Sequence, residues 1–409
     1  MENKKVSILF FPKEYYPLNR VRLTELYMKE FTNLGNKVTW ILLSDTITEK
    51  IKKIESGRNK SIILRSKSTD KKLHRFFNML SKLAKYKIGK RQMELTNVDI
   101  IVANDGIIDG FVAYLLSRKY DKPFVYYLSF LFFELDKDAF TEIRRNVDNL
   151  FKRIGALVKK RLYIYLIKKC DIFHPISQMM SEYFASYTQG KIVIPLPLCP
   201  AKHFRENYSV RKNSENHSYS LIYVGAIGAI RRIDFLIDLL QRIKENESEI
   251  QVKLRILGPI PDRDYLRKLQ NKAISLGLKK HVEILPGVPI SQVPDIIKCS
   301  DIGLSFYNPL LAYRTASPTK VVEYLSLGMP VIGNREVEDQ KEVIEMSGGG
   351  FATRYDINEA AEKVIYLLTN TDKMITMGES GRRWVEANRN YSIMARELDI
   401  KYNQLLRNK

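Results

Sequence analysis

The chain has 409 residues, of which 45% are hydrophobic, so it is long enough for two folded domains and too apolar for a disordered protein. Its formal net charge is +21, which favours an anionic partner such as a membrane surface or a nucleic acid. The three cysteines form no CxxC pair, and we expect free thiols in a reducing compartment: Cys170, Cys199 and Cys299.

The first residues, MENKKVSILFF, carry lysines before an apolar run that is too short for a signal peptide. No run of 18 uncharged apolar residues occurs in the sequence, which argues against a transmembrane helix. We therefore expect a cytoplasmic protein.

Strand-like and helix-like runs alternate through the first half of the chain. The expected strands are residues 6–11, 37–44, 98–105, 122–129, 170–177 and 191–197. The expected helices are residues 20–35, 106–120 and 178–190. Continuous apolar strands between helices are typical of a parallel sheet covered on both faces. Residues 1–197 are therefore expected to form a Rossmann-like domain.

Two basic segments interrupt this alternation. Residues 71–93 carry eight basic side chains and no acidic one, and residues 144–169 carry nine basic and one acidic. Residues 1–200 hold 36 Lys and Arg against 20 Asp and Glu, so most of the positive charge lies in the first half. Apolar residues recur at helical spacing in both segments. They are Leu73, Phe76, Phe77, Leu80, Leu83 and Ala84 in the first, and Leu150, Ile154, Leu157, Val158 and Leu162 in the second.

Three interpretations of the basic segments stay open. Basic amphipathic helices bind anionic membranes, where each Lys or Arg near the surface contributes roughly 1 kcal/mol. The same pattern suits a helix that turns its apolar side to a core and its basic side to water. Nucleic-acid binding is the third interpretation, but the sequence contains no zinc-finger or RNP-type signature.

The alternation restarts after residues 198–217, a polar stretch rich in Pro, Asn and Ser that we expect to be a linker. Residues 218–385 predict a second doubly wound domain, and residues 386–409 a C-terminal helix that packs back on the first domain. Ligands of such sheets bind beyond the carboxyl ends of the strands, so the two domains are expected to face each other across a cleft.

The first expected strand of the second domain runs into Gly225 and Gly228, and Arg231 and Arg232 follow where the next helix begins. Glycine lets a backbone approach a phosphate, and a helix N-terminus with two arginines favours negative charge. A tight turn with solvated arginines explains the same pattern equally well.

The segment SPTKVVEYLSLGMPVIGN, residues 317–334, predicts a short helix followed by a buried strand. Ser317 suits the N-cap and Pro318 the first helical position. Lys320 and Glu323 are i, i+3 neighbours and form either a local ion pair or a ligand site. In the second case Lys320 would face a diphosphate and Glu323 the hydroxyls of a sugar.

This segment resembles the signature of glycosyltransferase family 4, the group 1 enzymes of the GT-B fold, in which two Rossmann-like doubly wound domains face each other across a cleft. The resemblance continues through YVGAIGAIRRIDFLI, HVEILPGVPISQVPDIIKCSDIGLSFY and GGGFATRYDINEAAEKVIYLL. The first domain is similar to the family in outline only.

The resemblance implies roles for single residues. Glu323 would hold the ribose hydroxyls of the donor, and Arg232 and Lys320 would stabilise its diphosphate. These three are the expected catalytic residues. The other residues expected around the donor are Gly225, Arg231, Gly287, Val288, Thr315, Ser317, Pro318 and Thr319.

The sequence also departs from the family at four places. Thr315 stands where the family often has a glutamate that touches the donor sugar. Ala226 replaces a basic residue, Ser129 lies near the position of a histidine, and residues 17–20 (PLNR) replace a glycine pair.

The sequence therefore predicts a hexosyl-type glycosyltransferase (EC 2.4 class) that moves a sugar from a UDP- or GDP-sugar to an acceptor hydroxyl. The resemblance implies retention at the anomeric carbon, with neither metal nor cofactor. The basic first domain suggests a lipid-linked or glycan acceptor and peripheral attachment to the inner face of the cell membrane, in the synthesis of a cell-surface polysaccharide or glycolipid. The alternative is a sugar-nucleotide epimerase, or a catalytically weak binding protein of the same fold. No nucleic-acid partner is expected.

Overall fold

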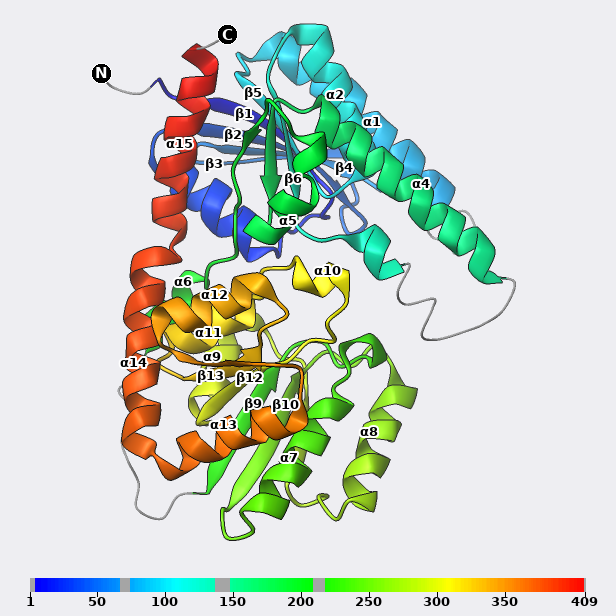
Figure 1. The fold of residues 1–409 in the computed structure, drawn as a ribbon. Coiled ribbons are helices and arrows are strands. Elements are labelled where there is room, and N and C mark those ends of the chain that lie inside the picture. Colours follow the sequence, from blue (N-terminus) through cyan, green and yellow to red (C-terminus); the bar gives the residue numbers. More distant parts are fainter. Residues whose placement is uncertain (1–3, 67–73, 137–147, 209–217, 408–409) are drawn as a thin grey trace. The chain divides into compact units, whose positions relative to one another are not determined.

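The computed structural model describes residues 4–66, 74–136, 148–208 and 218–407 (Figure 1). The chain forms two compact units. Unit 1 comprises residues 1–197 and 391–409, and unit 2 comprises residues 198–390. Each unit is an α/β unit built on one sheet, as continuous apolar strands between amphipathic helices require.

Unit 1 is built on an eight-stranded sheet in the order β3-β4-β2-β1-β5-β6-β7-β8. Its strands are β1 (Ser7–Pro12), β2 (Lys37–Ser44), β3 (Ile51–Ser56), β4 (Asn59–Arg65), β5 (Ile100–Asn104), β6 (Phe124–Leu128), β7 (Ile172–Pro175) and β8 (Ile192–Val193). All neighbouring pairs are parallel except β3 and β4. The parallel sheet expected from the sequence is therefore confirmed.

The hairpin of β3 and β4 was not expected from the sequence. Gly57 makes its turn with a left-handed φ of +57°. The outer strand β3 turns Lys and Glu side chains to solvent, which is how natural sheets protect an edge from further pairing. Such a strand lacks the continuous apolar run that marks the buried strands.

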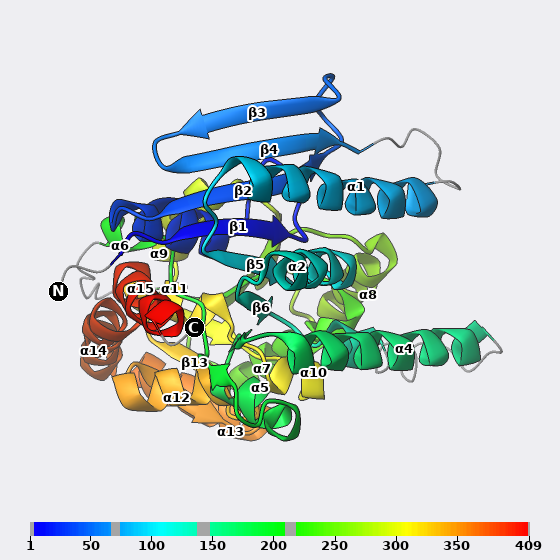
Figure 2. The same ribbon diagram turned by 90° about the horizontal axis from the view of Figure 1, so that it is seen from above.

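The helices of unit 1 lie on both faces of this sheet. They are η1 (Arg22–Phe31, wound as a π-helix), α1 (His74–Leu95), α2 (Ile107–Tyr120), α4 (Asp148–Lys169), α5 (Gln178–Tyr183), η2 (Ala185–Tyr187) and α15 (Tyr391–Arg407). Helices α1, α2 and α4 lie side by side on one face, and α15 packs against η1 on the other (Figure 2).

A buried polar chain fixes α15 to unit 1. The His174 ring nitrogen Nε2 lies 3.0 Å from the Tyr402 hydroxyl, which in turn lies 3.3 Å from the Tyr27 hydroxyl. The other nitrogen of His174 lies 2.9 Å from the carbonyl of Ile194. All three side chains are almost completely buried, so residues from both ends of the chain share one core.

Unit 2 is built on a six-stranded parallel sheet in the order β11-β10-β9-β12-β13-β14. Its strands are β9 (Tyr219–Val224), β10 (Val252–Gly258), β11 (Val282–Pro286), β12 (Ile302–Ser305), β13 (Val331–Asn334) and β14 (Gly350–Thr353). Counted from β9, this is the order 3-2-1-4-5-6 of a Rossmann fold. Its direction reverses between β9 and β12, and ligands bind at such a switch point.

The helices of unit 2 cover both faces of its sheet. They are α6 (Lys202–Glu206), η3 (Ala229–Arg231), α7 (Asp234–Asn246), α8 (Arg263–Ser275), η4 (Ile290–Gln292), α9 (Val293–Lys298), α10 (Leu311–Arg314), α11 (Thr319–Ser326), α12 (Glu338–Ser347), α13 (Ile357–Thr369) and α14 (Thr371–Asn388). Helix α6 lies inside the stretch expected as a linker, and its Phe204 is fully buried. Residues 209–217 of that stretch lie outside the described residues.

Candidate functional site

Strands β9 and β12 separate at the switch point of unit 2. Their pairing ends at Ile222 and Gly303, and beyond it the N–H of Val224 donates to the Tyr324 hydroxyl at 2.8 Å. The Tyr324 ring packs so closely on Gly303 that a Cβ there would lie 2.4 Å from it. Tyr324 therefore fixes helix α11 over the opening between the two strands.

Helix α11 begins at Thr319 and presents a first turn without a side-chain cap. Pro318 occupies the N-cap position, so the expectation of Ser317 as N-cap is wrong by one residue. The Ser317 hydroxyl instead accepts a hydrogen bond from the N–H of Leu198 at 2.9 Å. The N–H groups of an uncapped first turn carry partial positive charge and attract anions.

Lys320 lies in this first turn and points into a pocket of aromatic rings. Its ammonium lies 3.8 Å from the ring centre of Tyr223 and 4.4 Å from that of Tyr307. The residue is only 5% exposed, and its Nζ has no hydrogen-bond partner among the described residues. Burial holds the pKa of Lys320 well below its ordinary value; Arg231 lowers it further, and Glu323 opposes the shift.

Arg231 brings a second cation to the same rings. Its guanidinium lies 5.8 Å from the ring centre of Tyr307 and 5.7 Å from that of Tyr313. We call Lys320, Arg231 and the three tyrosines 223, 307 and 313 the cation cluster. Neither cation forms an ion pair with a carboxylate in the described part of the chain. A buried amine and a half-buried guanidinium without a carboxylate partner form a site that an anionic ligand would complete.

Glu323 lies one turn further along α11 and is half-buried. Burial raises the pKa of its carboxyl to about 7, and Lys320 opposes this shift. The Lys320 ammonium donates no hydrogen bond to Glu323, so the local ion pair that was one interpretation of the sequence is not formed.

Arg232, expected beside the diphosphate, lies apart from the cation cluster. Its backbone has a left-handed φ of +51°, and its guanidinium forms a 3.1 Å ion pair with Asp234. The Arg232 side chain is 51% exposed, whereas Arg231 turns towards the tyrosines. One backbone rotation therefore decides which of two adjacent arginines joins Lys320.

Three glycines lie at the carboxyl ends of neighbouring strands and keep this edge of the sheet compact. A Cβ at Gly225 would lie 3.0 Å from the Tyr223 hydroxyl and 3.4 Å from the Lys320 ammonium. A Cβ at Gly258 would lie 1.9 Å from the carbonyl oxygen of Gly225. Gly287, with Val288 after it, follows β11 and packs on Pro259. Gly287 and Val288, which were expected around the donor, are thus on the same edge as the cluster.

Thr315 and Thr319 complete the residues expected around the donor. Thr315 is fully buried at the end of α10, where its hydroxyl lies 3.2 Å from the carbonyl oxygen of Leu311. Thr319 opens α11 directly before Lys320. The tyrosines at 223, 307 and 313 could not be predicted from the sequence, because single tyrosines near strand ends carry no recognisable pattern.

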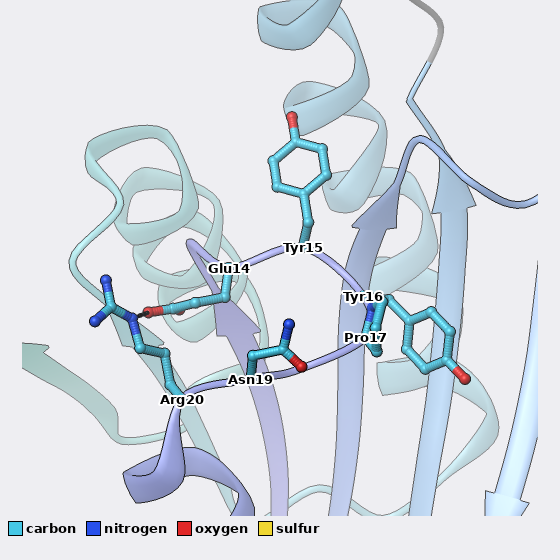
Figure 3. Close-up of a pocket in the computed structure, with 6 residues that line it drawn as sticks. All are labelled: Glu14, Tyr15, Tyr16, Pro17, Asn19 and Arg20. Atoms are coloured by element: carbon cyan, nitrogen blue, oxygen red, sulfur yellow. Dashed lines mark ion pairs between the residues drawn. The ribbon is translucent and has the colours of Figure 1, made fainter. Parts of the chain in front are cut away.

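Unit 1 has a pocket at the corresponding edge of its own sheet, in the loop that follows β1 (Figure 3). It is lined by Glu14, Tyr15, Tyr16, Pro17, Asn19 and Arg20. Glu14 points to Arg20, with 3.7 Å between its carboxylate and Nε, and accepts a hydrogen bond from Asn104 at 3.1 Å. The PLNR departure noted in the sequence belongs to this loop.

Ser129, another departure from the family, binds a buried carboxylate at the same edge of unit 1. Its N–H and hydroxyl donate to Asp105 at 2.6 and 2.5 Å. Asp105 follows β5 with a left-handed φ of +53°. In the described ranges, no group of His, Cys, Asp and Glu is arranged to hold a metal ion.

Residues 204–384 match the family model described as glycosyl transferases group 1. An uncharacterised glycosyltransferase of Methanocaldococcus jannaschii is 22% identical over 301 residues, which cover 73% of this chain and 74% of that protein. These matches confirm the resemblance that the signature around Glu323 indicated.

Solved structures match over nearly the whole chain. The match to the sucrose-phosphate synthase of Thermosynechococcus elongatus covers 99% of this chain and 100% of that structure, with a TM-score of 0.72 and 15% identity. The match to Anabaena HepE in complex with UDP covers 98% of this chain and 100% of that structure, with a TM-score of 0.65 and 14% identity. The expected GT-B fold is therefore confirmed.

Proposed function

We propose that this chain, a GT-B protein whose residues 204–384 match the group 1 glycosyltransferases, moves a sugar from a UDP- or GDP-sugar to an acceptor hydroxyl. The observation that carries the proposal is the cation cluster, in which buried Lys320, half-buried Arg231 and an uncapped helix N-terminus meet without a carboxylate partner among the described residues. A diphosphate has the charge to complete such a site. The Anabaena relative contains UDP, which supports a nucleotide ligand.

The proposed roles follow from the positions of the side chains. The departing diphosphate gains negative charge as its bond to the sugar breaks. Fixed positive groups that meet this charge stabilise the transition state, and removing one typically costs roughly 3 to 4 kcal/mol. Lys320, Arg231 and the backbone amides of Thr319 and Lys320 supply this charge, and Glu323 accepts hydrogen bonds from the ribose. Arg232 contributes to the surrounding field from its place beside Asp234.

From the family resemblance we also propose that the reaction retains the configuration at the anomeric carbon and proceeds without a metal. Proton NMR of the first-formed product would show the configuration of the new bond. Activity that survives EDTA would support metal independence, and activity restored only by a divalent cation would contradict it.

A thermal-shift screen of nucleotides and nucleotide sugars tests the proposal. A ligand at 100 times its Kd should add about 2.7 kcal/mol of stability. Lys320→Met and Glu323→Gln should each lose most of this shift. Lys279→Met is the matched control, because Lys279 is an exposed lysine of the same unit. A full shift in both site variants would show that the nucleotide binds elsewhere.

We also place the acceptor on a lipid, because unit 1 exposes apolar side chains among basic ones. Helix α4 buries Ala156, Tyr163, Leu166 and Ile167. The expected amphipathic stripe instead faces solvent, since Ile154, Leu157 and Val158 are 48%, 58% and 48% exposed. The interpretation as a core-facing stripe is therefore wrong for these residues.

Basic side chains surround this exposed stripe of α4. Arg153, Lys159 and Arg161 are exposed beside it, although Lys159 also pairs with Asp136 at 2.7 Å. On α1, Leu83 is 50% exposed, whereas Leu73, Phe76, Phe77 and Leu80 lie outside the described side chains. Apolar side chains ringed by cations suit the interface of an anionic leaflet. Within the described residues, no helix has the length and apolarity to cross a bilayer.

Vesicle sedimentation tests whether this chain binds an anionic membrane surface. Such binding would support the proposed role in cell-surface polysaccharide or glycolipid synthesis. Binding should rise with the content of anionic lipid and fall with salt. Leu157→Asn with Val158→Asn should weaken it, while Ile274→Asn, which changes an exposed apolar residue of unit 2, should not. Binding that ignores lipid charge and salt would contradict the proposal.

Thr315 favours one second candidate, a sugar-nucleotide epimerase or a catalytically weak binding protein of the same fold. Its short, buried hydroxyl lies against the carbonyl of Leu311 and replaces the carboxylate that the family often carries. Incubation with UDP- and GDP-sugars separates the candidates, because a transferase slowly hydrolyses its donor without acceptor. A bound nucleotide sugar that stays intact would favour the binding protein, and one that changes its sugar configuration would favour the epimerase.

A further inference from the structure

The two basic residues of the cation cluster differ in how burial affects their protonation. Arg231 keeps a guanidinium that stays protonated at any ordinary pH. Lys320 carries an amine, which loses its proton when it is buried without a counter-charge. Its neighbours are the ring faces of Tyr223 and Tyr307, and neither ring accepts a hydrogen bond from it.

The groups that act on Lys320 come from four segments of unit 2. Tyr223 lies on β9, Tyr307 follows β12, Arg231 ends η3 and Glu323 lies on the same helix. Arg231 disfavours a proton on Lys320, and Glu323 favours one. The hydroxyl of Tyr324 accepts the N–H of Val224 and is thereby engaged. Among the described residues, none of these neighbours gives the amine an anionic hydrogen-bond partner.

We propose that binding of a nucleotide sugar is coupled to the uptake of one proton from the solvent, and that the amine of Lys320 takes up this proton. This inference rests on the proposed function. Without ligand, Lys320 is a neutral amine among the tyrosine rings. With ligand, the diphosphate supplies the missing negative charge, and the protonated ammonium donates hydrogen bonds to its oxygens. The proton comes from the solvent, so one proton disappears from the buffer for each ligand bound.

Glu323 sets the pH at which this uptake is visible. At pH 8 its carboxyl is already ionised, because burial raises its pKa only to about 7. At pH 6 the carboxyl holds a proton, and ribose hydroxyls that donate to the carboxylate favour its release. The proton lost by Glu323 then balances the proton gained by Lys320. Net uptake is therefore expected to be close to one at pH 8 and smaller at pH 6.

Titration calorimetry tests the inference with UDP-glucose and GDP-mannose as probes. The binding enthalpy is measured at pH 8 in Hepes and in Tris, whose protonation enthalpies differ widely. The difference between the buffers should correspond to about one proton taken up per ligand. Lys279→Met should behave as the unmodified protein does. Lys320→Arg should bind with equal enthalpy in both buffers, because a guanidinium is already charged.

A second variant keeps the inference testable if Lys320→Arg does not fold or bind. Glu323→Gln removes the internal proton donor and weakens binding, so it is titrated at higher ligand concentration, and its net uptake at pH 6 should equal its uptake at pH 8. In the unmodified protein, the Kd should also rise roughly tenfold per pH unit above the pKa of Lys320, as one-proton linkage requires.

The outcomes separate the two proposals. Binding with the same enthalpy in both buffers at pH 8 would overturn the proton uptake and leave the proposed function standing. Buffer dependence that persists in Lys320→Arg would place the proton on another group and also overturn it. If no UDP- or GDP-sugar binds at any pH, the proposed function fails, and this inference fails with it.

Discussion

At the carboxyl edges of the two sheets, a buried lysine has different surroundings: a carboxylate partner in unit 1 and aromatic rings in unit 2. Both sheets reverse their strand order beside their first strand, between β1 and β5 in unit 1 and between β9 and β12 in unit 2. In unit 1, Lys85 donates to Asp109 at 2.6 Å and to the carbonyl of Pro12 at 2.8 Å. In unit 2, Lys320 is almost as deeply buried but faces tyrosine rings.

This difference shows that topology alone does not make an anion site. A reversal of strand order beside the first strand produces a switch point in both units, and each switch point gathers charged residues. In unit 1 Lys85 has a carboxylate partner within the fold, whereas in unit 2 Lys320 and Arg231 have none among the described residues. The basic groups left without a carboxylate therefore favour unit 2 as the place where an anionic ligand binds.

The largest effect is expected from breaking the buried ion pair of Lys85 and Asp109 in unit 1. Lys85 and Asp109 are 1% and 0% exposed, so Asp109→Ala leaves a buried ammonium without its carboxylate. Removing one partner of a buried pair typically costs about 3–5 kcal/mol. Urea unfolding followed by Trp40 fluorescence, in a Trp384→Phe background, measures the loss in unit 1 alone. The double variant Lys85→Met with Asp109→Leu should recover most of it, and a loss below about 1 kcal/mol would show that the pair is not what holds this edge.

Acid should destabilise unit 1 through His174. Burial lowers the pKa of His174 to about 4, against the opposing effect of the Ile194 carbonyl. An unfolded histidine titrates near 6.5, so the unfolded chain binds more protons between pH 6.5 and 4. Unit 1 should lose up to about 3 kcal/mol as the pH falls through this window. In His174→Gln the same Trp40 measurement should show a flatter pH dependence, and an equal dependence would assign the effect to other groups.

Glu323 should give unit 2 the opposite pH dependence. Its folded pKa of about 7 lies above its ordinary value of 4.5, so the folded state binds more protons between these two pH values. Unit 2 should therefore lose stability as the pH rises from 4.5 to 7, by about 1–2 kcal/mol for a half-buried carboxyl. Trp384 fluorescence in a Trp40→Phe background reports on unit 2. Glu323→Gln should remove this slope, and a slope that survives would exclude Glu323 as its source.

Lys320→Met is expected to stabilise the protein slightly, whereas Asp109→Ala is expected to destabilise it. It removes an amine that has no hydrogen-bond partner, so ligand-free unit 2 should gain about 1 kcal/mol while nucleotide binding is lost. Thermal unfolding with and without UDP-glucose measures both effects. Ligand-free destabilisation by more than about 1 kcal/mol would show that Lys320 supports the fold of unit 2.

The smallest expected effect belongs to Arg232→Ala. This residue has a side chain that is 51% exposed and forms an ion pair with Asp234, so stability should change by about 0.5 kcal/mol or less. Nucleotide affinity should change less than threefold, whereas Arg231→Ala should weaken it by one to two orders of magnitude. Titration calorimetry of the two variants compares adjacent arginines directly. Equal losses would show that both reach the ligand.

Much of the fold could be predicted from the sequence, because its central strands are continuous apolar runs. Residues 37–44 form β2 as expected, and the parallel order of both sheets follows from the alternation with helices. The hairpin of β3 and β4 was missed because an edge strand carries no such run. The start of α11 was misplaced because the Ser317 hydroxyl serves Leu198, a residue 119 positions away.

The candidate site was predictable only in part. The signature around Lys320 and Glu323 is contiguous, so its resemblance to the group 1 glycosyltransferases could be recognised in the sequence. The aromatic walls come from three separate segments, and only the fold brings Tyr223, Tyr307 and Tyr313 to one place. The choice between Arg231 and Arg232 depends on a single φ angle, which composition does not encode.

Helix α15 also determines when the protein can fold during synthesis. Residues 391–407 follow all of unit 2 in the sequence, yet Tyr402 completes the core of unit 1 with Tyr27 and His174. A ribosome therefore finishes unit 2 before it supplies the last piece of unit 1. Folding from the N-terminus, which is usual for domains made in sequence, is delayed here. Unit 1 therefore becomes complete last.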